Sequence, residues 1–426
     1  MNDFSLSLKI LDNVLNNDKK SNEEINKYAA DADNLGFVTR IVYGVLENKL
    51  YLDYMIRKLS SVRLKKIHQK VLIILEIGFY NIHFLNTKDY AVVNELVELT
   101  KKINYRSAGF VNGILRNFIR DEKEIVAIRE SNDLKSLSIR YSLPLELTTY
   151  IYDNYGMDYT KNFLRFINEE QKISIRVNQL KTFKEKLKSL LEEEGYEIIV
   201  GKISENALIV LNPSGLIETK AFKEGLFTIQ QESSMKAVEI LDPSEGSKVL
   251  DLCAAPGTKT SYIAEYTNNN SAITANDLAF NKLSLIEENI NRLGLKNIKL
   301  TSFDGKDIVN EFENQFDYVL VDAPCSGLGV MGRKPEIRYN RTMKDIEDLS
   351  KLQKSILDQA IKYLKPAGIL VYSTCTIGKL ENADNYNYLK NKSNLDHLQI
   401  DGKDYLEYIN FIEKTDGFFI SRFRKK

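Results

Sequence analysis

The sequence predicts a multidomain protein, with an all-α N-terminal domain, a small α/β linker domain and a C-terminal α/β domain of the Rossmann-like type. Three observations support this prediction: a length of 426 residues, the absence of any proline before Pro144, and a strand–helix alternation after about residue 226. A chain this long exceeds one ordinary core, so two or three domains are expected. We expect the domains at residues 1–128, 129–225 and 226–426.

The N-terminal part has the pattern of a helical bundle. In its first helix Phe4, Leu8, Leu11 and Leu15 recur at three- and four-residue spacing, which makes an apolar stripe. A segment without proline favours helices joined by short connections. The charged segment 121–136 is expected to be an exposed connection to the next domain.

The rest of the chain alternates between strand and helix patterns. Residues 172–181 form a strand-like run, and a charged helix and the strand-like "NALIVLN" follow, which indicates a small α/β unit. Further on, nearly all-apolar strands alternate with helices: "KVLDL", "SAITAND", "NIKLTSFD", "FDYVLVDAP" and "GILVYSTC". This pattern predicts a parallel sheet covered on both faces, in which ligands bind beyond the carboxyl ends of the strands.

The composition is that of a soluble globular protein, with 43% hydrophobic and 28% charged residues. The N-terminus lacks the pattern of a signal peptide, and the most apolar run, residues 71–80, is too short to span a membrane. We therefore expect a cytoplasmic protein with no membrane partner. Its three cysteines and three histidines lack finger-like spacing and predict neither a disulfide framework nor a metal site.

Several aspartates lie at or just past the predicted strand ends: Asp251, Asp277, Asp304 and Asp322. The loop "DLCAAPGTKT" has a single glycine, Gly257, and lacks the glycine pattern that holds a pyrophosphate. Asp277 ends the second strand, where a carboxylate can accept hydrogen bonds from ribose hydroxyls. These features indicate an adenosine-type cofactor without phosphates, which predicts S-adenosylmethionine. The competing interpretation of Asp277 is that it caps the following helix.

Cys325 and Cys375 stand at the ends of two predicted strands, in a chain with three cysteines. Carbon 5 of a pyrimidine is a poor nucleophile, but addition of a thiolate at carbon 6 makes carbon 5 enamine-like and able to accept a methyl group. Cysteine suits this addition because part of it is ionised near neutral pH and the thiolate is strongly nucleophilic. The two cysteines therefore predict pyrimidine carbon 5 methylation, and the competing interpretation is a pair of buried structural cysteines.

Charge distribution is more informative than net charge, because 59 basic residues balance 59 acidic ones. Arg57–Lys70 has six basic residues and no acidic one, and Lys101–Arg120 has five basic residues and no acidic one. Two such tracts in one domain favour a phosphate-binding surface over two solvated helix faces.

A target base must be unstacked to reach both thiols, so loop or single-stranded RNA is the expected substrate.

Three motifs, "DLCAAPGTKT", "DAPCSGLGV" and "YSTCT", together resemble those of the RNA (cytosine-C5)-methyltransferases of the Sun/RsmB type in order and spacing. The segments "RIVYGVLENKLYLDYMI", "YAVVNELVELTKK" and "GFVNGILRNFIR" resemble the RNA-binding helical domain of the antitermination factor NusB. "RYSLPLELTTYIYDNYG", "RVNQLK" and "DGFFISRFRK" fit the remaining segments of the family. The resemblance covers nearly the whole chain. The combination of segments is similar to that of the bacterial 16S ribosomal RNA enzyme of the family.

The resemblance implies roles for individual residues. Cys375 would be the nucleophile and Cys325 would assist release of the product, while Asp322 would contact the cofactor and the cytosine and help to protonate its ring. The residues that would hold S-adenosylmethionine are Cys253, Ala254, Ala255, Pro256, Gly257, Thr258, Lys259, Asp277, Asp304 and Asp322. The expected RNA contacts are Arg63, Lys65, Lys66, Lys101 and Lys102, with Arg333, Lys334 and Arg338 in the basic loop "GRKPEIRYN". Two departures from the family are Thr258 in place of a usual glycine and Thr376 in place of a usual serine.

The implied activity is methylation of carbon 5 of a cytosine in 16S ribosomal RNA, by a monomer without a metal. One alternative is methylation of a different RNA such as tRNA, and another is a non-catalytic RNA-binding factor of the antitermination type. The N-terminal domain alone would allow that last function, but the strand-end cysteines and aspartates speak against it. An amino-group methyltransferase is disfavoured because "DAPC" lacks the second proline and the aromatic residue of that motif.

Overall fold

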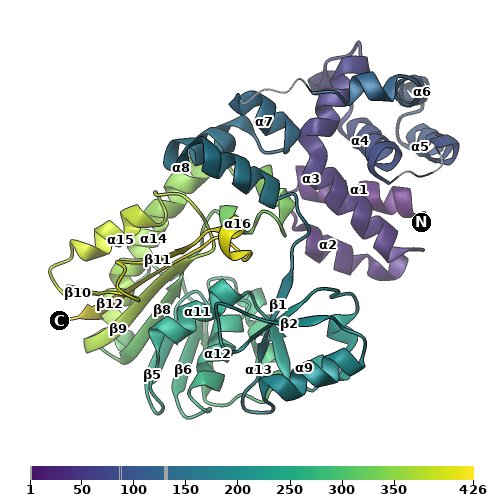
Figure 1. Ribbon diagram of the computed structural model, residues 1–426. Helices are drawn as coiled ribbons and strands as arrows, with labels where there is room; N and C mark the ends of the chain where they lie inside the picture. The colour runs from purple at the N-terminus through teal and green to yellow at the C-terminus, as the bar shows by residue number, and fades with distance from the viewer. Residues whose placement is uncertain (1, 86, 88, 129–132) are drawn as a thin grey trace. The chain divides into compact units, whose positions relative to one another are not determined.

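The computed structural model describes residues 2–85, 87, 89–128 and 133–426. By its internal contacts the chain forms two compact units, which are shown in Figure 1. Unit 1 comprises Met1–Glu169 and Met331–Met343, and unit 2 comprises Glu170–Val330 and Lys344–Lys426. The expected boundary after residue 128 borders residues 129–132, which lie outside the described residues, and the expected boundary after residue 225 falls inside unit 2.

The first eight helices of the chain, and the 3₁₀ turn Pro335–Arg338, belong to unit 1. The helices are α1 (Asp3–Asn16), α2 (Ser21–Lys27), α3 (Leu35–Leu59), α4 (Gln69–Phe84), α5 (Asp89–Asn104), α6 (Ala108–Ile125), α7 (Leu134–Arg140) and α8 (Leu145–Phe166). The stripe predicted for α1 faces the core, because Leu8 and Leu11 are buried and Phe4 and Leu15 pack against the same cluster. The prediction of a helical N-terminal domain is confirmed.

The segment 121–136 differs from its expected form as an exposed connection. Helix α6 runs through a kink at Asp121 and ends at Ile125, and α7 begins at Leu134. Ile125 is buried in the core of unit 1, which explains why the helix continues past Asp121. Residues 121–125 and 134–136 of the segment are therefore helical rather than connecting, although Lys123 and Glu124 are exposed as expected, and residues 129–132 lie outside the described residues.

Unit 2 begins with a small antiparallel sheet. Its elements are β1 (Ile173–Val177), α9 (Lys184–Glu193), β2 (Ile198–Val200), β3 (Ala207–Val210), α10 (Lys220–Lys223) and β4 (Phe227–Ile229). The strand order is β2-β3-β1-β4. This confirms the small α/β unit, and its last strand lies just beyond the expected boundary after residue 225.

The larger sheet of unit 2 contains β5 (Lys248–Asp251), β6 (Ala272–Asn276), β7 (Ile298–Thr301), β8 (Phe316–Asp322), β9 (Leu364–Thr374), β10 (Leu395–Leu398), β11 (Leu406–Tyr408) and β12 (Phe418–Lys425). In the order β10-β12-β9-β8-β5-β6-β7, strands β9 to β7 are parallel neighbours, whereas β12 is antiparallel to β9, β10 and β11. The five strands predicted to form a parallel sheet, β5 to β9, are therefore parallel as expected, and β10, β11 and β12 extend that sheet with antiparallel pairs.

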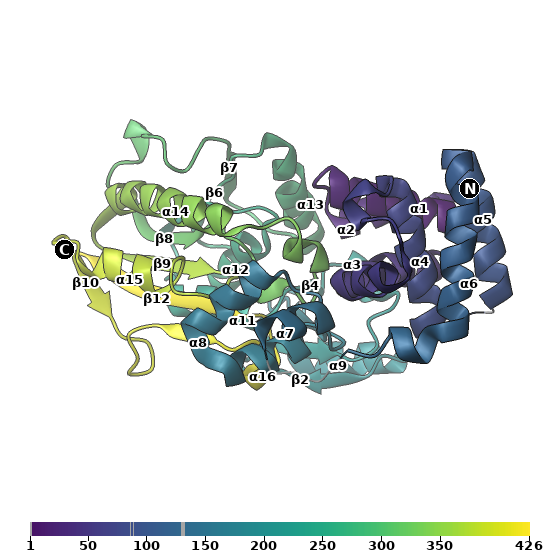
Figure 2. The ribbon, with the colours of Figure 1, turned by 90° about the horizontal axis from the view of Figure 1, so that it is seen from above.

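Helices cover both faces of this sheet, as Figure 2 shows. They are α11 (Glu232–Leu241), α12 (Thr258–Tyr266), α13 (Leu283–Leu293), α14 (Met343–Tyr363) and α15 (Ala383–Lys390), and the short α16 (Asn410–Glu413) lies between β11 and β12 in the chain. Val249 and Leu320 pack with α11 and α12 on one face, while Leu250 packs with α14 on the other. Gly294 ends α13 in the left-handed conformation, as the sequence predicts.

No helix in the part of the chain that the structure describes combines the length and the apolar character that crossing a membrane requires.

Candidate active site

The predicted site residues gather at the carboxyl edge of the parallel strands. Asp251 and Asp322 are the last residues of β5 and β8, and Asp277 and Cys375 directly follow β6 and β9. Asp304 lies in the loop after β7. Because parallel strands end at the same edge of a sheet, these side chains share one edge, as expected from the sequence.

The two cysteines of this edge are in contact. The Sγ atoms of Cys325 and Cys375 are 3.3 Å apart, and both residues are partly exposed. The hydrogen bond with Cys375, followed by burial, raises the pKa of the Cys325 thiol well above its usual range. The contact with the Cys375 thiol therefore favours the protonated form of Cys325.

Asp322 joins the cysteine strands to the first loop. Its Oδ2 atom is 2.6 Å from Nζ of Lys259 on α12, and its Oδ1 atom accepts a 2.8 Å hydrogen bond from Oγ of Ser373 on β9. The Lys259 side chain is only 9% exposed, so solvent screens this ion pair weakly. The pair fixes the Asp322 carboxylate beside the neighbouring strand that leads to Cys375.

Asp251 is a buried carboxyl group with one unpartnered atom. Its Oδ2 accepts a 2.6 Å hydrogen bond from Oγ1 of Thr260, whereas Oδ1 is buried without a partner. Burial raises the pKa of Asp251 to about 7, and the neighbouring Asp322 and Asp277 contribute to the shift. Burial likewise raises the pKa of Cys253 well above its usual range.

Asp277 is oriented by backbone donors. Its Oδ2 accepts from the backbone N–H of Ala255 at 3.1 Å, and its Oδ1 accepts from the N–H of Ala279 at 3.0 Å. The second bond shows that Asp277 does start the turn that precedes α13. A carboxylate oxygen accepts more than one hydrogen bond, so this role leaves capacity for ribose hydroxyls.

The loop before α12 requires glycine at one position. Gly257 has a φ of +95°, and a Cβ atom there would lie 3.0 Å from Cγ2 of Ile286. Thr258, by contrast, is the first residue of α12 and does not have a positive φ. The backbone therefore does not need the glycine that is usual in the family at this position.

Gly329 allows a close approach behind the cysteines. A Cβ atom at Gly329 would lie 2.1 Å from the carbonyl oxygen of Gly417 and 2.9 Å from that of Cys375. The N–H of Gly417 donates to the Gly329 carbonyl at 3.0 Å. The chain after Cys325 thus packs directly against the loop that carries Cys375.

Arg176 on β1 is a residue of the site region that the sequence reasoning did not single out. Its guanidinium is fully buried and binds both carboxylate oxygens of Glu265 on α12, at 3.0 and 2.7 Å. It also donates to the carbonyl oxygen of Thr258 at 2.7 Å and to Oγ of Ser261 at 3.0 Å. The signal in the sequence is a charged residue inside the strand-like run "ISIRV".

Replacing Arg176 with alanine is expected to lower the free energy of unfolding by roughly 3–5 kcal/mol, because it leaves the buried Glu265 carboxylate unpaired. Calorimetric unfolding of the purified variant measures this effect. The matched control is Lys220→Ala, which breaks an exposed ion pair with Glu224 and should change stability little. An Arg176 variant as stable as this control would contradict the structural role.

The basic residues predicted to bind RNA differ in their exposure. Arg63, Lys65, Lys66, Lys101, Lys102 and Lys334 are exposed, and Arg333 is half-buried. Lys101 forms a 2.6 Å ion pair with the exposed Glu98. The first basic tract spans the connection between α3 and α4, with the 3₁₀ turn Leu64–Lys66, and the second runs from the end of α5 through the 3₁₀ turn Tyr105–Ser107 into α6.

Arg338 has a different environment from the one expected for an RNA contact. It is fully buried, and its guanidinium donates to the carbonyl oxygens of Ile167 at 2.7 Å, Glu47 at 2.9 Å and Tyr141 at 3.2 Å. Ile167 and Tyr141 are the C-caps of α8 and α7, where carbonyl groups lack helical partners. Its burial leaves Arg338 a structural residue of unit 1, and we withdraw it as an RNA contact.

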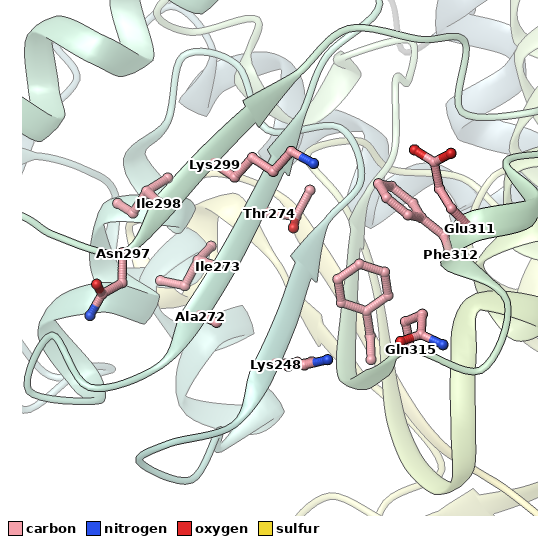
Figure 3. Close-up of a pocket in the computed structure, with 11 residues that line it drawn as sticks. Lys248, Ala272, Ile273, Thr274, Asn297, Ile298, Lys299, Glu311, Phe312 and Gln315 are labelled. Atoms are coloured by element: carbon pink, nitrogen blue, oxygen red, sulfur yellow. The ribbon is translucent and has the colours of Figure 1, made fainter.

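A groove on unit 2 lies away from these residues. It has a volume of about 510 Å³ and is lined by residues such as Lys248, Ala272 and Phe316, which begin β5, β6 and β8 (Figure 3). This is the amino edge of the parallel strands, opposite to the aspartates and cysteines.

Among the described residues no group of His, Cys, Asp and Glu side chains could hold a metal ion.

Family models match three parts of the chain. Residues 238–424 match the 16S rRNA methyltransferase RsmB/F model, and residues 4–120 match the NusB family. Residues 144–216 match the ferredoxin-like domain of RsmF/B-like methyltransferases. The three matches follow one another along the chain in the order that the sequence predicts.

Similar proteins extend the likeness to nearly the whole chain. The probable ribosomal RNA small subunit methyltransferase B of Bacillus subtilis is 35% identical over 411 residues, which cover 92% of this chain and 91% of that protein. The ribosomal RNA small subunit methyltransferase B of Photorhabdus laumondii is 31% identical over 389 residues, or 90% and 89% of the two chains.

Solved structures show the same fold. The crystal structure of PH0851 has a TM-score of 0.84 and 25% identity, and covers 100% of this chain and 99% of that chain. NSun6 from Pyrococcus horikoshii, solved with SFG, has a TM-score of 0.59 and 26% identity, and covers 66% of this chain and 98% of that chain.

The fold, the strand-end site and these likenesses define an S-adenosylmethionine-dependent methyltransferase that acts on ribosomal RNA. The expected cofactor, the NusB-like domain and the Rossmann-like fold are thereby confirmed. The chain belongs to the ribosomal RNA small subunit methyltransferase B family.

Proposed function

We propose that the protein methylates carbon 5 of a cytosine in 16S ribosomal RNA through a covalent bond between Cys375 and carbon 6. The observation that supports this most is the contact of two thiols, 3.3 Å apart, at the carboxyl ends of neighbouring strands. Methylation of an amino group or a ribose hydroxyl requires no thiol. Two thiols at one site fit a reaction that both forms and breaks a carbon–sulfur bond.

The proposed reaction begins at Cys375. Its thiolate bonds to carbon 6 of the cytosine, and the electron pair of the 5,6 double bond moves to carbon 5, which becomes nucleophilic. Bound S-adenosylmethionine would supply the electrophilic methyl group that carbon 5 takes up, with S-adenosylhomocysteine as the leaving group. A base then removes the proton of carbon 5, the double bond re-forms, and the sulfur leaves with its electron pair.

Cys325 is placed to act in the release step. One thiol suffices for the addition, and the second lies within hydrogen-bonding distance of it. We assign Cys325 to proton removal from carbon 5, directly or by positioning the group that does so. Asp322 is proposed to accept a hydrogen bond from the cytosine amino group, because its carboxylate is already fixed by Lys259 and Ser373.

The residues of the carboxyl edge fit the cofactor chemically. The oriented carboxylate of Asp277 suits ribose hydroxyls, and the adjacent Leu278, which is 65% exposed, offers an apolar surface to a purine. S-adenosylmethionine carries a positive sulfonium and an ammonium group, which the carboxylates of Asp304 and Asp322 complement. The loop from Cys253 to Lys259 is proposed to complete the site.

Replacing Asp277 with alanine is expected to weaken cofactor binding roughly 10- to 150-fold, because a lost hydrogen bond to a charged group contributes about 1.5–3 kcal/mol. Titration calorimetry with S-adenosylhomocysteine measures the change. The control is Asp317→Ala, since Asp317 accepts from the backbone N–H of Lys248 at the amino edge of the same sheet. Equal affinity of the Asp277 variant and this control would remove Asp277 from the cofactor site.

The exposed basic residues of unit 1 are proposed to hold the RNA by its phosphates, without reading its bases. Changing Lys65, Lys66, Lys101 and Lys102 to glutamine should weaken RNA binding and flatten its dependence on salt. Each lost phosphate contact removes about 0.7–0.9 units from the slope of log affinity against log salt. Filter binding of a 16S RNA fragment over a range of salt concentrations measures both quantities.

The control for this experiment changes four exposed lysines of unit 2, Lys351, Lys362, Lys390 and Lys403, to glutamine. The total charge then falls by the same amount in both variants. A salt slope that decreases equally in the two variants would show a general charge effect and contradict a specific role of the unit 1 lysines.

Nucleoside analysis tests the proposed function. The purified protein is incubated with a 16S RNA transcript and S-adenosylmethionine, and the digested RNA is examined for methylated nucleosides by mass spectrometry. The proposal predicts 5-methylcytidine. A different methylated nucleoside would contradict the proposed chemistry, and RNA binding without any methylation in the transcript or in ribosomal particles would favour the antitermination-type alternative.

A further inference from the structure

The side chains of the residues that follow the two cysteines form a hydrogen bond with each other. Ser326 follows Cys325 and Thr376 follows Cys375, and their hydroxyl oxygens are 2.6 Å apart. Both side chains are buried. The N–H of Leu328 also donates to Oγ1 of Thr376 at 3.2 Å. The positions of the two thiols are therefore coupled through the residues behind them.

Glu381 holds the loop of Cys325. Its fully buried carboxylate accepts from the backbone N–H of Ser326 at 2.9 Å and from the Ser326 hydroxyl. The amide of Gln353 on α14 donates to Oε1 of Glu381 and to the carbonyl oxygen of Pro324, both at 2.9 Å. Glu381 and Gln353 thus bind the residues on both sides of Cys325.

The next residue, Asn382, holds the loop of Cys375 in the same way. Its Oδ1 accepts from Oγ1 of Thr374 at 2.6 Å, and its Nδ2 donates to the carbonyl oxygen of Thr376 at 3.2 Å. Both Glu381 and Asn382 lie in the turn before α15. The side chains of these two adjacent residues therefore hold Ser326, Thr374 and Thr376, while Gln353 holds Pro324 on the other side of Cys325.

This turn is itself anchored in the core of unit 2. The hydroxyl of Tyr372 on β9 donates to the carbonyl oxygen of Glu381 at 2.6 Å. Asn385 on α15 donates to Oε1 of Gln353 at 2.7 Å and to the Tyr372 hydroxyl at 2.9 Å. Satisfied buried networks of this kind are rigid, whereas a lost partner in them is costly.

We propose that Glu381 is a positioning residue, which holds the Cys325 thiol at the distance from Cys375 that product release requires. This inference rests on the proposed function of the two cysteines. The carboxylate accepts from the N–H and hydroxyl of Ser326 and from the amide of Gln353. Burying a carboxylate is unfavourable, and an amide in its place would turn one acceptor into a donor that faces another donor.

The test is Glu381→Gln, which keeps the shape of the side chain and removes its charge. The methylation kcat should fall about 10- to 100-fold, as displacements near 1 Å typically cause. The affinity for S-adenosylhomocysteine, measured by calorimetry, should change less than twofold. The matched control is Glu239→Gln, because Glu239 accepts from the hydroxyls of Ser204 and Tyr262 in the same unit and should keep normal kcat.

A second readout needs no RNA. Alkylation of the native protein by iodoacetamide, followed by mass spectrometry of each cysteine peptide, reports the reactivity of the thiols. In Glu381→Gln the rate at Cys325 should rise at least threefold relative to Cys253, since a neighbouring negative charge is lost and the loop is loosened. A role in overall stability alone would not change the ratio of the two rates below the melting temperature.

The outcomes separate this inference from the proposed function. Ser326→Ala removes one hydrogen bond to Glu381. It should lower the methylation kcat and raise the relative alkylation rate of Cys325, each by a smaller amount than Glu381→Gln does. This second variant tests the proposal if Glu381→Gln does not fold. Normal kcat and unchanged relative alkylation in the folded variants would overturn the positioning role. A changed alkylation ratio together with no 5-methylcytidine from the wild type would instead contradict the proposed reaction and leave the positioning intact.

Discussion

Replacing Cys375 with alanine is expected to abolish methyl transfer, with a fall in kcat on the order of 10⁴-fold or more, as removal of an enzyme nucleophile typically causes. Without the thiolate, carbon 5 of the cytosine is not activated, so no covalent complex with RNA should form. The affinity for S-adenosylhomocysteine should stay within twofold of the wild type, because the residues proposed to hold the cofactor lie after other strands of the edge. Transfer of a labelled methyl group to RNA measures the loss.

The matched control for this variant is Thr376→Ser. It alters the next residue but keeps the hydroxyl that bonds to Ser326 and Leu328. Its kcat should remain within a few-fold of the wild type. A Cys375→Ala variant that retains methylation like this control would show that Cys375 is not the nucleophile.

Replacing Cys325 with alanine is expected to stop turnover after the first methyl transfer. Addition and methylation need Cys375, whereas release of the product needs proton removal from carbon 5, which we assign to Cys325. The variant should therefore remain bonded to its RNA and migrate slowly on a denaturing gel, with about one methyl group transferred per enzyme molecule.

The double variant Cys325→Ala/Cys375→Ala provides the control and should give no slow band, because it lacks the proposed nucleophile. Normal turnover by the Cys325 variant would exclude its role in release. A covalent complex in the Cys375 variant instead would reverse the two roles, while leaving the reaction class unchanged.

The edge that carries the site could be predicted from the sequence because its strands are short, apolar and followed by helices. Each of Asp251, Asp277 and Cys375 falls at a strand end in the structure, as the pattern indicates. The sequence also placed the two cysteines at the ends of neighbouring strands, and β8 and β9 are neighbours, but the 3.3 Å contact between the thiols depends on the loops after those strands and could not be predicted.

Buried polar residues were the part that the sequence did not reveal. Arg176 and Glu381 bind partners as many as 89 and 55 residues away in the chain, so no local pattern indicates their role. The prediction that Arg338 contacts RNA was wrong for a related reason. Its position in a basic loop favoured an RNA contact, but the carbonyl groups at the ends of α7 and α8 use its donors inside unit 1.

One measurement tests the central claim most directly. The wild-type protein is incubated with S-adenosylmethionine and 16S RNA that contains 5-fluorocytidine, in which fluorine replaces the proton that release must remove. Because the carbon–sulfur bond then cannot break, the account predicts a stable complex, and peptide mapping should find the methylated cytosine attached to Cys375. Attachment through Cys325 or methylation of this RNA without any covalent complex would contradict it.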